Sequence, residues 1–216
     1  MRLRLLALAA WVALPMTVPA QTPANPDPAE PDFTITVQGT FDAETLAEFN
    51  RRVQAYVALR ARLEEGLPPL VVTTNADEIE TFERRLGERI RHARASRRGQ
   101  IFAPRMERQL KRLMDTKADA AMIALIMEDG PGEFDVDVND RYKKTHSLAT
   151  MPPRLLLMLP DLPKDLEYRF VGRHLILRDA RANIILDEVP HAIRCHDCVL
   201  KPEPEESGDS VPSPAP

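Results

Sequence analysis

The chain contains two cysteines, and both lie in the segment Cys195-His196-Asp197-Cys198. A C-x-x-C pair can carry thiol–disulfide chemistry when nearby cations or a helix N-terminus lower the pKa of a thiol. Redox motifs of the thioredoxin type open a helix after a strand, whereas this one precedes a proline-rich tail. Outside the cytosol the same pair can form a disulfide that closes a short loop and adds little stability. A local disulfide between Cys195 and Cys198, a redox or metal role, and inert thiols all remain open.

The same segment offers a set of metal ligands. His191, Cys195, His196 and Cys198 supply nitrogen and sulfur atoms within eight residues, and zinc binds such sets tetrahedrally. A structural zinc site usually has a second, distant ligand pair, which this pattern lacks. The four residues are therefore weak metal candidates, and no motif in the sequence predicts a bound cofactor.

A second partial motif begins at Asp135. Asp135, Asp137 and Asn139 match the opening spacing of a calcium-binding EF-hand loop. The match then fails, because Asp140 replaces the glycine of the turn and His146 replaces the bidentate glutamate. Alternation with two valines is explained more simply by a half-buried strand over 134–138.

Basic residues gather in the middle of the chain. Residues 84–112 contain eleven lysines or arginines against two acids, whereas 113–140 contain one lysine against eight acids. One interpretation is an anion-binding surface on a helix. The alternative is a solvated helix face whose arginines pair with Glu80, Glu83, Glu88 and the acidic segment that follows. The arginines that define this surface are Arg84, Arg85, Arg91, Arg94, Arg97 and Arg98.

The sequence predicts no catalytic residue. It has no G-x-S-x-G, H-E-x-x-H or glycine-rich phosphate loop, and only eight glycines. His92, His146 and His174 are expected to be surface or partly buried residues. Glu167 and Asp187 flank a predicted sheet, but their spacing does not identify an acid–base pair.

Three helices are expected in the first part of the domain, and the basic run over 84–112 lies on the second and third of them. Apolar residues recur at three- and four-residue steps over 42–65, and Gly66 and two prolines end that helix. A second helix begins after the capping residue Asn75 and fades near 98–99. A third runs from Pro104 to about Glu128, where Gly130 follows.

Strands dominate the rest of the ordered region. Short strands are expected at 33–37 and 134–138, and then at 167–171, 174–178 and 183–186. Gly172-Arg173 has the glycine-first form of a two-residue hairpin turn. Helices first and strands later predict an α+β domain, in which three N-terminal helices pack with a small C-terminal antiparallel β-meander.

The two ends of the chain differ from the region between them. Residues 1–20 have a basic start, a short apolar run and small residues before Gln21, as in a secretory signal peptide cleaved after Ala20. Residues 21–32 and 201–216 are proline-rich, and we expect a disordered linker and a disordered acidic tail. One domain over 33–200 remains, without a transmembrane segment, in the periplasm or secreted.

The segments 165–190 and 66–82 resemble uncharacterised bacterial proteins that carry signal peptides. The resemblance rests on Phe170-Val171-Gly172 and Ala182-Asn183. It implies one ordered, exported domain and no particular activity or site residue.

These features together predict a protein of the cell envelope that binds or scaffolds another component, and they do not indicate an enzyme. Residues 33–200 hold equal numbers of basic and acidic residues, so bulk charge predicts no nucleic-acid partner. The expected partner is an envelope protein or an anionic ligand, bound by the basic helical surface or by an edge of the sheet. The alternative is a thiol-redox or metal-binding protein that uses residues 195–198.

Overall fold

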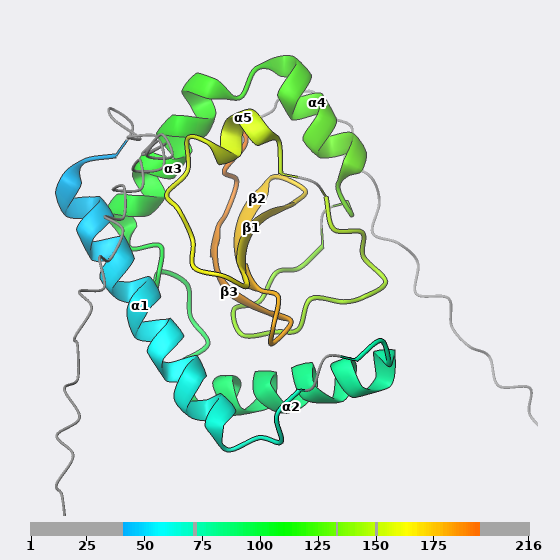
Figure 1. Cartoon of the computed structure of the whole chain (residues 1–216). Helices are drawn as coiled ribbons and strands as arrows, with labels where there is room; N and C mark the ends of the chain where they lie inside the picture. Colours follow the sequence, from blue (N-terminus) through cyan, green and yellow to red (C-terminus); the bar gives the residue numbers. More distant parts are fainter. Residues whose placement is uncertain (1–40, 71–72, 133, 150, 195–216) are drawn as a thin grey trace, which may run out of the picture. The chain divides into compact units, whose positions relative to one another are not determined.

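The protein is an α+β domain, as the sequence predicts. The computed structural model describes residues 41–70, 73–132, 134–149 and 151–194. Helices come first and a three-stranded antiparallel sheet follows (Figure 1). The elements are α1 Ala43–Glu65, α2 Ala76–Ala93, α3 Pro104–Lys117, α4 Ala120–Asp129, α5 Pro153–Leu156, β1 Leu166–Val171, β2 His174–Asp179 and β3 Ile184–Val189.

Local capping chemistry sets the ends of the first two helices. The Asp42 carboxylate accepts a hydrogen bond from the Thr45 amide at 2.9 Å and caps α1. Asn75 caps α2 in the same way, as predicted, by accepting from the amide of Asp77 at 3.0 Å. Helix α1 ends at Glu65, immediately before Gly66. Pro68 and Pro69 follow Gly66 in the connection to α2, so the helix ends where the sequence predicts.

The predicted third helix is divided into two. Helix α3 ends at Lys117, and Asp119 begins α4 by accepting a hydrogen bond from the Met122 amide at 2.9 Å. An aspartate side chain that captures a free amide favours a new helix start over continuation of the old one. The apolar pattern continues across the break between α3 and α4, and for this reason the sequence predicts a single helix.

The sheet is a meander in the order β1-β2-β3. Val171 pairs with His174 across the two-residue turn, and Gly172 has a φ of 51°. That positive φ suits glycine at the first turn position, as the sequence predicts. The pairing of β2 with β3 shifts by one residue at Leu177 and Arg178. The shift leaves Leu186 in a bulge on β3.

The predicted strand over 134–138 is wrong. These residues form no strand, although their burial does alternate, with Asp135 and Asp137 exposed. The edge of β3 instead pairs with the next few residues. Ile185 accepts a hydrogen bond from the Asn139 amide at 2.7 Å and donates one to the Asp140 carbonyl at 2.9 Å. The predicted strand over 33–37 lies outside the described residues.

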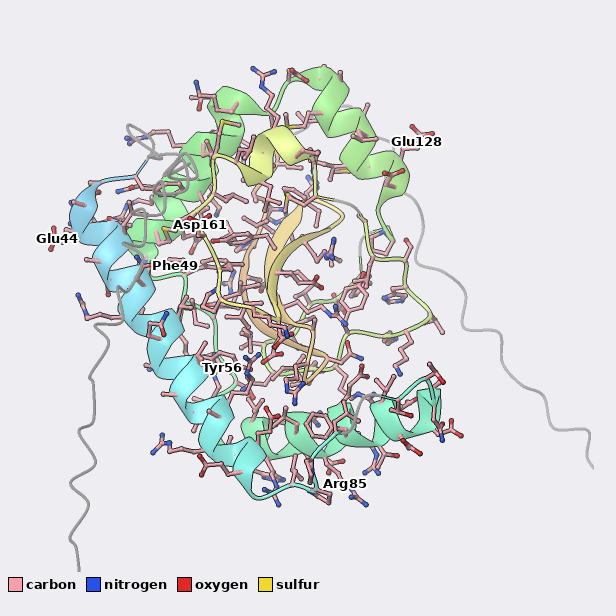
Figure 2. The ribbon with its side chains drawn as sticks, in the orientation of Figure 1. Glu44, Phe49, Tyr56, Arg85, Glu128 and Asp161 are labelled. Atoms are coloured by element: carbon pink, nitrogen blue, oxygen red, sulfur yellow. The ribbon has the colours of Figure 1, made fainter. Side chains whose placement is uncertain are left out.

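The two faces of the sheet bury separate apolar clusters. The larger cluster joins one face to the helices, and its aromatic part stacks Phe49 of α1 on Phe102 and Phe102 on Tyr168 of β1. Figure 2 shows Phe49 and Tyr56 on the side of α1 that faces the sheet. The smaller cluster covers the opposite face with Tyr142 and its neighbours. Helix α1 packs on α2 and α3, and α3 packs on β3.

All three tyrosines are buried, which makes a pH test possible. Burial raises the pKa of Tyr56, Tyr142 and Tyr168, and the pKa of Tyr142 reaches about 12. We expect the folded protein to show almost no tyrosinate absorbance at about pH 10, where the urea-unfolded chain is half ionised.

The stability of the fold should therefore fall in alkali. Above pH ~10 only the unfolded state releases the phenolic protons, so each tyrosine lowers the free energy of unfolding by about 1.4 kcal/mol per pH unit until its folded pKa is reached. Denaturant midpoints measured from about pH 9 to 11 test the slope. A folded-state tyrosinate signal with a midpoint near pH ~10 would contradict the burial of these rings.

Candidate functional site

Charge is divided along α2. Two acidic residues of its first half pair with the loop between α4 and α5, since Glu80 lies 3.6 Å from Arg141 and 3.3 Å from Lys144, and Glu83 lies 3.4 Å from Lys144. Of the three glutamates that the alternative interpretation pairs with the arginines of this helix, Glu80 and Glu83 thus have other partners, whereas Glu88 pairs with Arg84 as that interpretation predicts. The basic second half of α2 is thus left to other partners.

Half of the predicted anion-binding arginines already have a partner. Arg84 pairs with Glu88 at 3.4 Å, and Arg98 pairs with Glu188 at 3.5 Å. Arg94 turns inward and donates to Leu186 O at 3.1 Å and to an asparagine side chain.

Arg94 has a structural role. Its guanidinium donates to the carbonyl of Leu186, the residue in the β3 bulge, and lies 5.2 Å from the centre of the Tyr56 ring. The same group donates to Asn139 Oδ1 at 2.6 Å. Burial lowers the pKa of Arg94. This arginine belongs to the packing between α2 and the sheet.

The other three arginines are exposed. Within the part of the chain that the structure describes, Arg85, Arg91 and Arg97 form no ion pair and have a large exposed surface. Arg85 and Arg91 lie on α2, whereas Arg97 lies in the loop after it. Figure 2 shows Arg85 on the side of α2 turned away from the sheet. These three charges are available to an anion from solvent.

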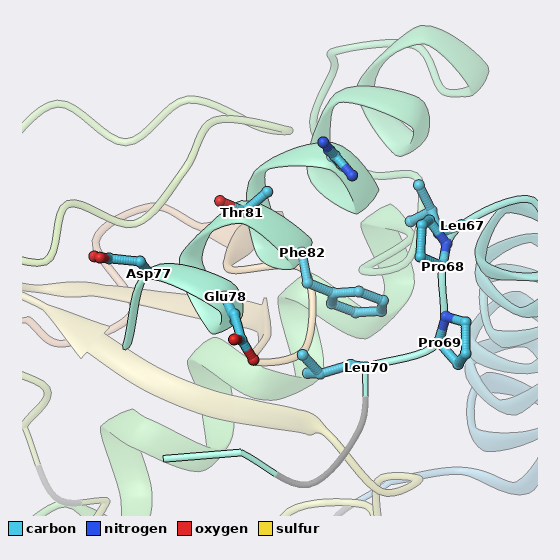
Figure 3. A pocket seen from close by; sticks show the side chains of 9 residues that line it. Leu67, Pro68, Pro69, Leu70, Asp77, Glu78, Thr81 and Phe82 are labelled. Atoms are coloured by element: carbon cyan, nitrogen blue, oxygen red, sulfur yellow. The ribbon is translucent and has the colours of Figure 1, made fainter. Parts of the chain in front are cut away.

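A groove runs between the outer face of α2 and the 66–70 connection. Two adjoining hollows of ≈ 360 Å³ and ≈ 370 Å³ share three of their lining residues, one of which is Arg85. Figure 3 shows the Phe82 ring of α2 pointing toward the connection. We call the two hollows the α2 groove; its lining residues are Gly66, Leu67, Pro68, Pro69, Leu70, Asp77, Glu78, Thr81, Phe82, Arg85, Glu88, Arg89 and His92.

Arg89 fixes the shape of this groove. It donates to Leu63 O at 2.9 Å and to Gly66 O at 2.8 Å. These are carbonyls at the C-terminus of α1, where a cation also interacts favourably with the helix dipole. Arg89 therefore sets the position of α2 against the end of α1. Arg85, one turn earlier, also lines the groove but forms no ion pair with any of the described residues.

Most of the predicted metal site lies outside the part of the chain that the structure describes. Cys195, His196 and Cys198 lie outside the described residues, so the disulfide and metal hypotheses stay predictions. His191 is exposed, and its ring centroid lies 5.1 Å from that of His174. Among the described residues no group of three or more histidine, cysteine or acidic side chains is arranged to hold a metal ion.

The three residues that match the opening of an EF-hand loop have different surroundings. Asp135 and Asp137 are exposed, whereas Asn139 is buried. The side-chain Nδ2 of Asn139 donates to Ala95 O at 3.2 Å, and its side-chain Oδ1 accepts from Arg94. This asparagine joins the end of α2 to the sheet edge.

The remaining histidines and acids have structural surroundings. His92 is exposed and His174 half-buried, but His146 is buried, with its ring centroid 4.0 Å from that of Phe134. The apolar cluster on this face of the sheet draws the imidazole in. Glu167 bonds to two arginines and Asp187 to backbone amides, so the two do not face one another as an acid and a base.

The sheet edges differ in accessibility. Residues 139–142 pair with the outer edge of β3. Beside β1 lies another hollow of ≈ 310 Å³, lined by residues of β1 and of 151–162. The sequence predicts a sheet edge as the alternative binding surface, and this hollow adjoins the β1 edge.

No family model, curated protein or solved structure matches this chain. None of the helices in the described ranges is both long and apolar enough to cross a bilayer.

Proposed function

We propose that this is an extracytoplasmic binding or scaffolding protein, without catalytic activity of its own, whose α2 groove holds an anionic group of its ligand. Arg85 carries the proposal. It is the exposed cation of the groove that no acid neutralises within the described residues, and it stands beside an apolar surface. The leader at residues 1–20 supports export to the periplasm or the medium.

The lining of the groove suits binding. It combines aliphatic and aromatic surface with a few charged groups, and such a combination fixes the orientation of a ligand. Arg91 and Arg97 add positive charge outside the groove, and this charge raises the local concentration of an anionic partner.

Photo-cross-linking in the cells that produce the protein tests the proposal. We expect benzoylphenylalanine at position 81, in the groove, to capture one identified species, and the same group at position 125, exposed on α4, not to capture it. Arg85→Ala should reduce the yield about tenfold, the effect of losing about 1.4 kcal/mol. Recovery of the protein alone, or equal capture from both positions, would refute the groove as the binding surface.

A further inference from the structure

We infer that the ligand of the α2 groove is a short extended peptide that runs from a basic N-terminal end through apolar side chains to a free C-terminal carboxylate. This inference rests on the function proposed above and specifies the chemistry of its ligand. Three features of the groove carry it: an apolar floor, a line of charges along α2, and the distance between the opposite charges.

The floor of the groove accepts apolar side chains. Phe82 presents one side to the groove, and Leu67, Leu70 and two prolines face it across the gap (Figure 3). The guanidinium of Arg181 lies 5.0 Å from the centre of the Phe82 ring, and Glu64 neutralises its charge. Phe82 is thereby held in place, and apolar side chains of a ligand can be buried against a fixed surface.

Charges of opposite sign stand in line along the groove. Glu78, Arg85 and His92 follow one another at seven-residue steps, which puts them on one stripe of the helix. The stripe is acidic at the end near Leu70 and basic toward the C-terminus of α2. Glu78 accepts a hydrogen bond only from the neighbouring Asn75 side chain, at 3.1 Å, and forms no ion pair within the described residues.

The separation of these charges matches a short peptide. Seven helical residues rise about 10 Å, and an extended tetrapeptide spans about the same distance between its terminal charges. A carboxylate can accept two parallel hydrogen bonds from the guanidinium of Arg85, and an ammonium group then lies near Glu78. A fatty acid or a phosphate would engage the basic end alone and leave Glu78 without a counterion.

Binding of the tetrapeptide Lys-Leu-Val-Leu to the mature full-length protein tests the inference by calorimetry. We expect C-terminal amidation to weaken binding at least tenfold, and Arg85→Ala to weaken binding of the free acid equally, as expected for the loss of one charge-assisted pair. The Arg85→Ala variant should bind the amidated peptide as the original protein does. Glu78→Gln should weaken binding about threefold. Arg91→Ala, which removes an exposed α2 cation outside the groove, is the control and should change nothing.

Binding tests with decanoate and inorganic phosphate, two anions that are not peptides, distinguish failure of the peptide inference from failure of the proposed anion-binding function. If either binds with dependence on Arg85 while the peptide does not, the groove holds anions but the peptide assignment is wrong. If the free-acid and amidated peptides bind equally, the assignment is also wrong. Failure of all three probes to bind would overturn the anion-binding function together with the peptide inference.

Discussion

Replacing Asp179 with alanine should lower the free energy of unfolding by about 3–5 kcal/mol. The Asp179 side chain has no solvent exposure. Its carboxylate accepts from the Tyr56 hydroxyl, from Arg60 Nη1 at 3.1 Å, and from the Arg181 and Ala182 amides at 2.8 and 3.1 Å. Alanine at this position would leave a buried guanidinium, a phenol and two amides without their acceptor, and such groups are costly to bury unpaired.

A double-mutant cycle with Tyr56→Phe checks the cause of this loss. The phenylalanine variant alone removes one hydrogen bond and should cost about 1 kcal/mol. In the double variant there is no hydroxyl left unpaired, so the combined cost should be smaller than the sum of the two single costs. Urea denaturation of the three variants measures this coupling. An Asp179→Ala variant destabilised by less than about 1 kcal/mol would show that water replaces the carboxylate.

The sequence predicts the elements of this fold best where a residue determines the conformation of its own immediate backbone neighbours. Asn75 and Gly172 act through their own backbone neighbourhood, as a helix cap and as a turn with positive φ, so spacing alone identifies α2 and the β1–β2 hairpin. The alternation over 134–138 correctly predicts which side chains face inward, but the strand that it also predicts does not form. Strand formation depends on a partner, and the partner of β3 is the segment that begins at Asn139.

The candidate site is predictable in part. The cluster of arginines is visible in the sequence, but the division into paired and unpaired members depends on tertiary contacts. Arg94 turns inward because the β3 bulge and Asn139 present oxygens to it. In the sequence, Pro68 and Pro69 indicate only the end of a helix. The packing of α1 on α2 brings these prolines opposite α2, where they line one groove together with Arg85.

A second buried carboxylate, that of Asp187, holds the loop between α2 and α3 in place. Asp187 of β3 accepts hydrogen bonds from the amides of Gly99 at 2.9 Å, Ile101 at 2.7 Å, Phe102 at 2.9 Å and Glu188 at 2.9 Å. Burial raises the pKa of the Asp187 carboxyl, while these amide hydrogen bonds act in the opposite direction. One side chain thus satisfies three amides of a loop that has few strand or helix partners.

Asp187→Ala should therefore cost about 3 kcal/mol, because the buried amides of Ile101 and Phe102 lose their acceptor and each unsatisfied donor costs about 1–3 kcal/mol. The variant should destabilise the 99–102 loop by more than it destabilises the domain as a whole. Hydrogen exchange at these two amides should accelerate at least 100-fold beyond what the fall in global stability explains.

Asp137→Ala is the matched control, since Asp137 is an exposed acid whose side chain has no partner among the described residues. This variant should change the free energy of unfolding by less than about 0.5 kcal/mol.

The loop that Asp187 holds also carries Phe102, which stacks between Phe49 and Tyr168. Release of this loop in the Asp187→Ala variant should therefore loosen the contact of α1 with the sheet. Unchanged exchange at Ile101 and Phe102 in the Asp187→Ala variant would show that packing of Phe102, and not the carboxylate, holds this loop.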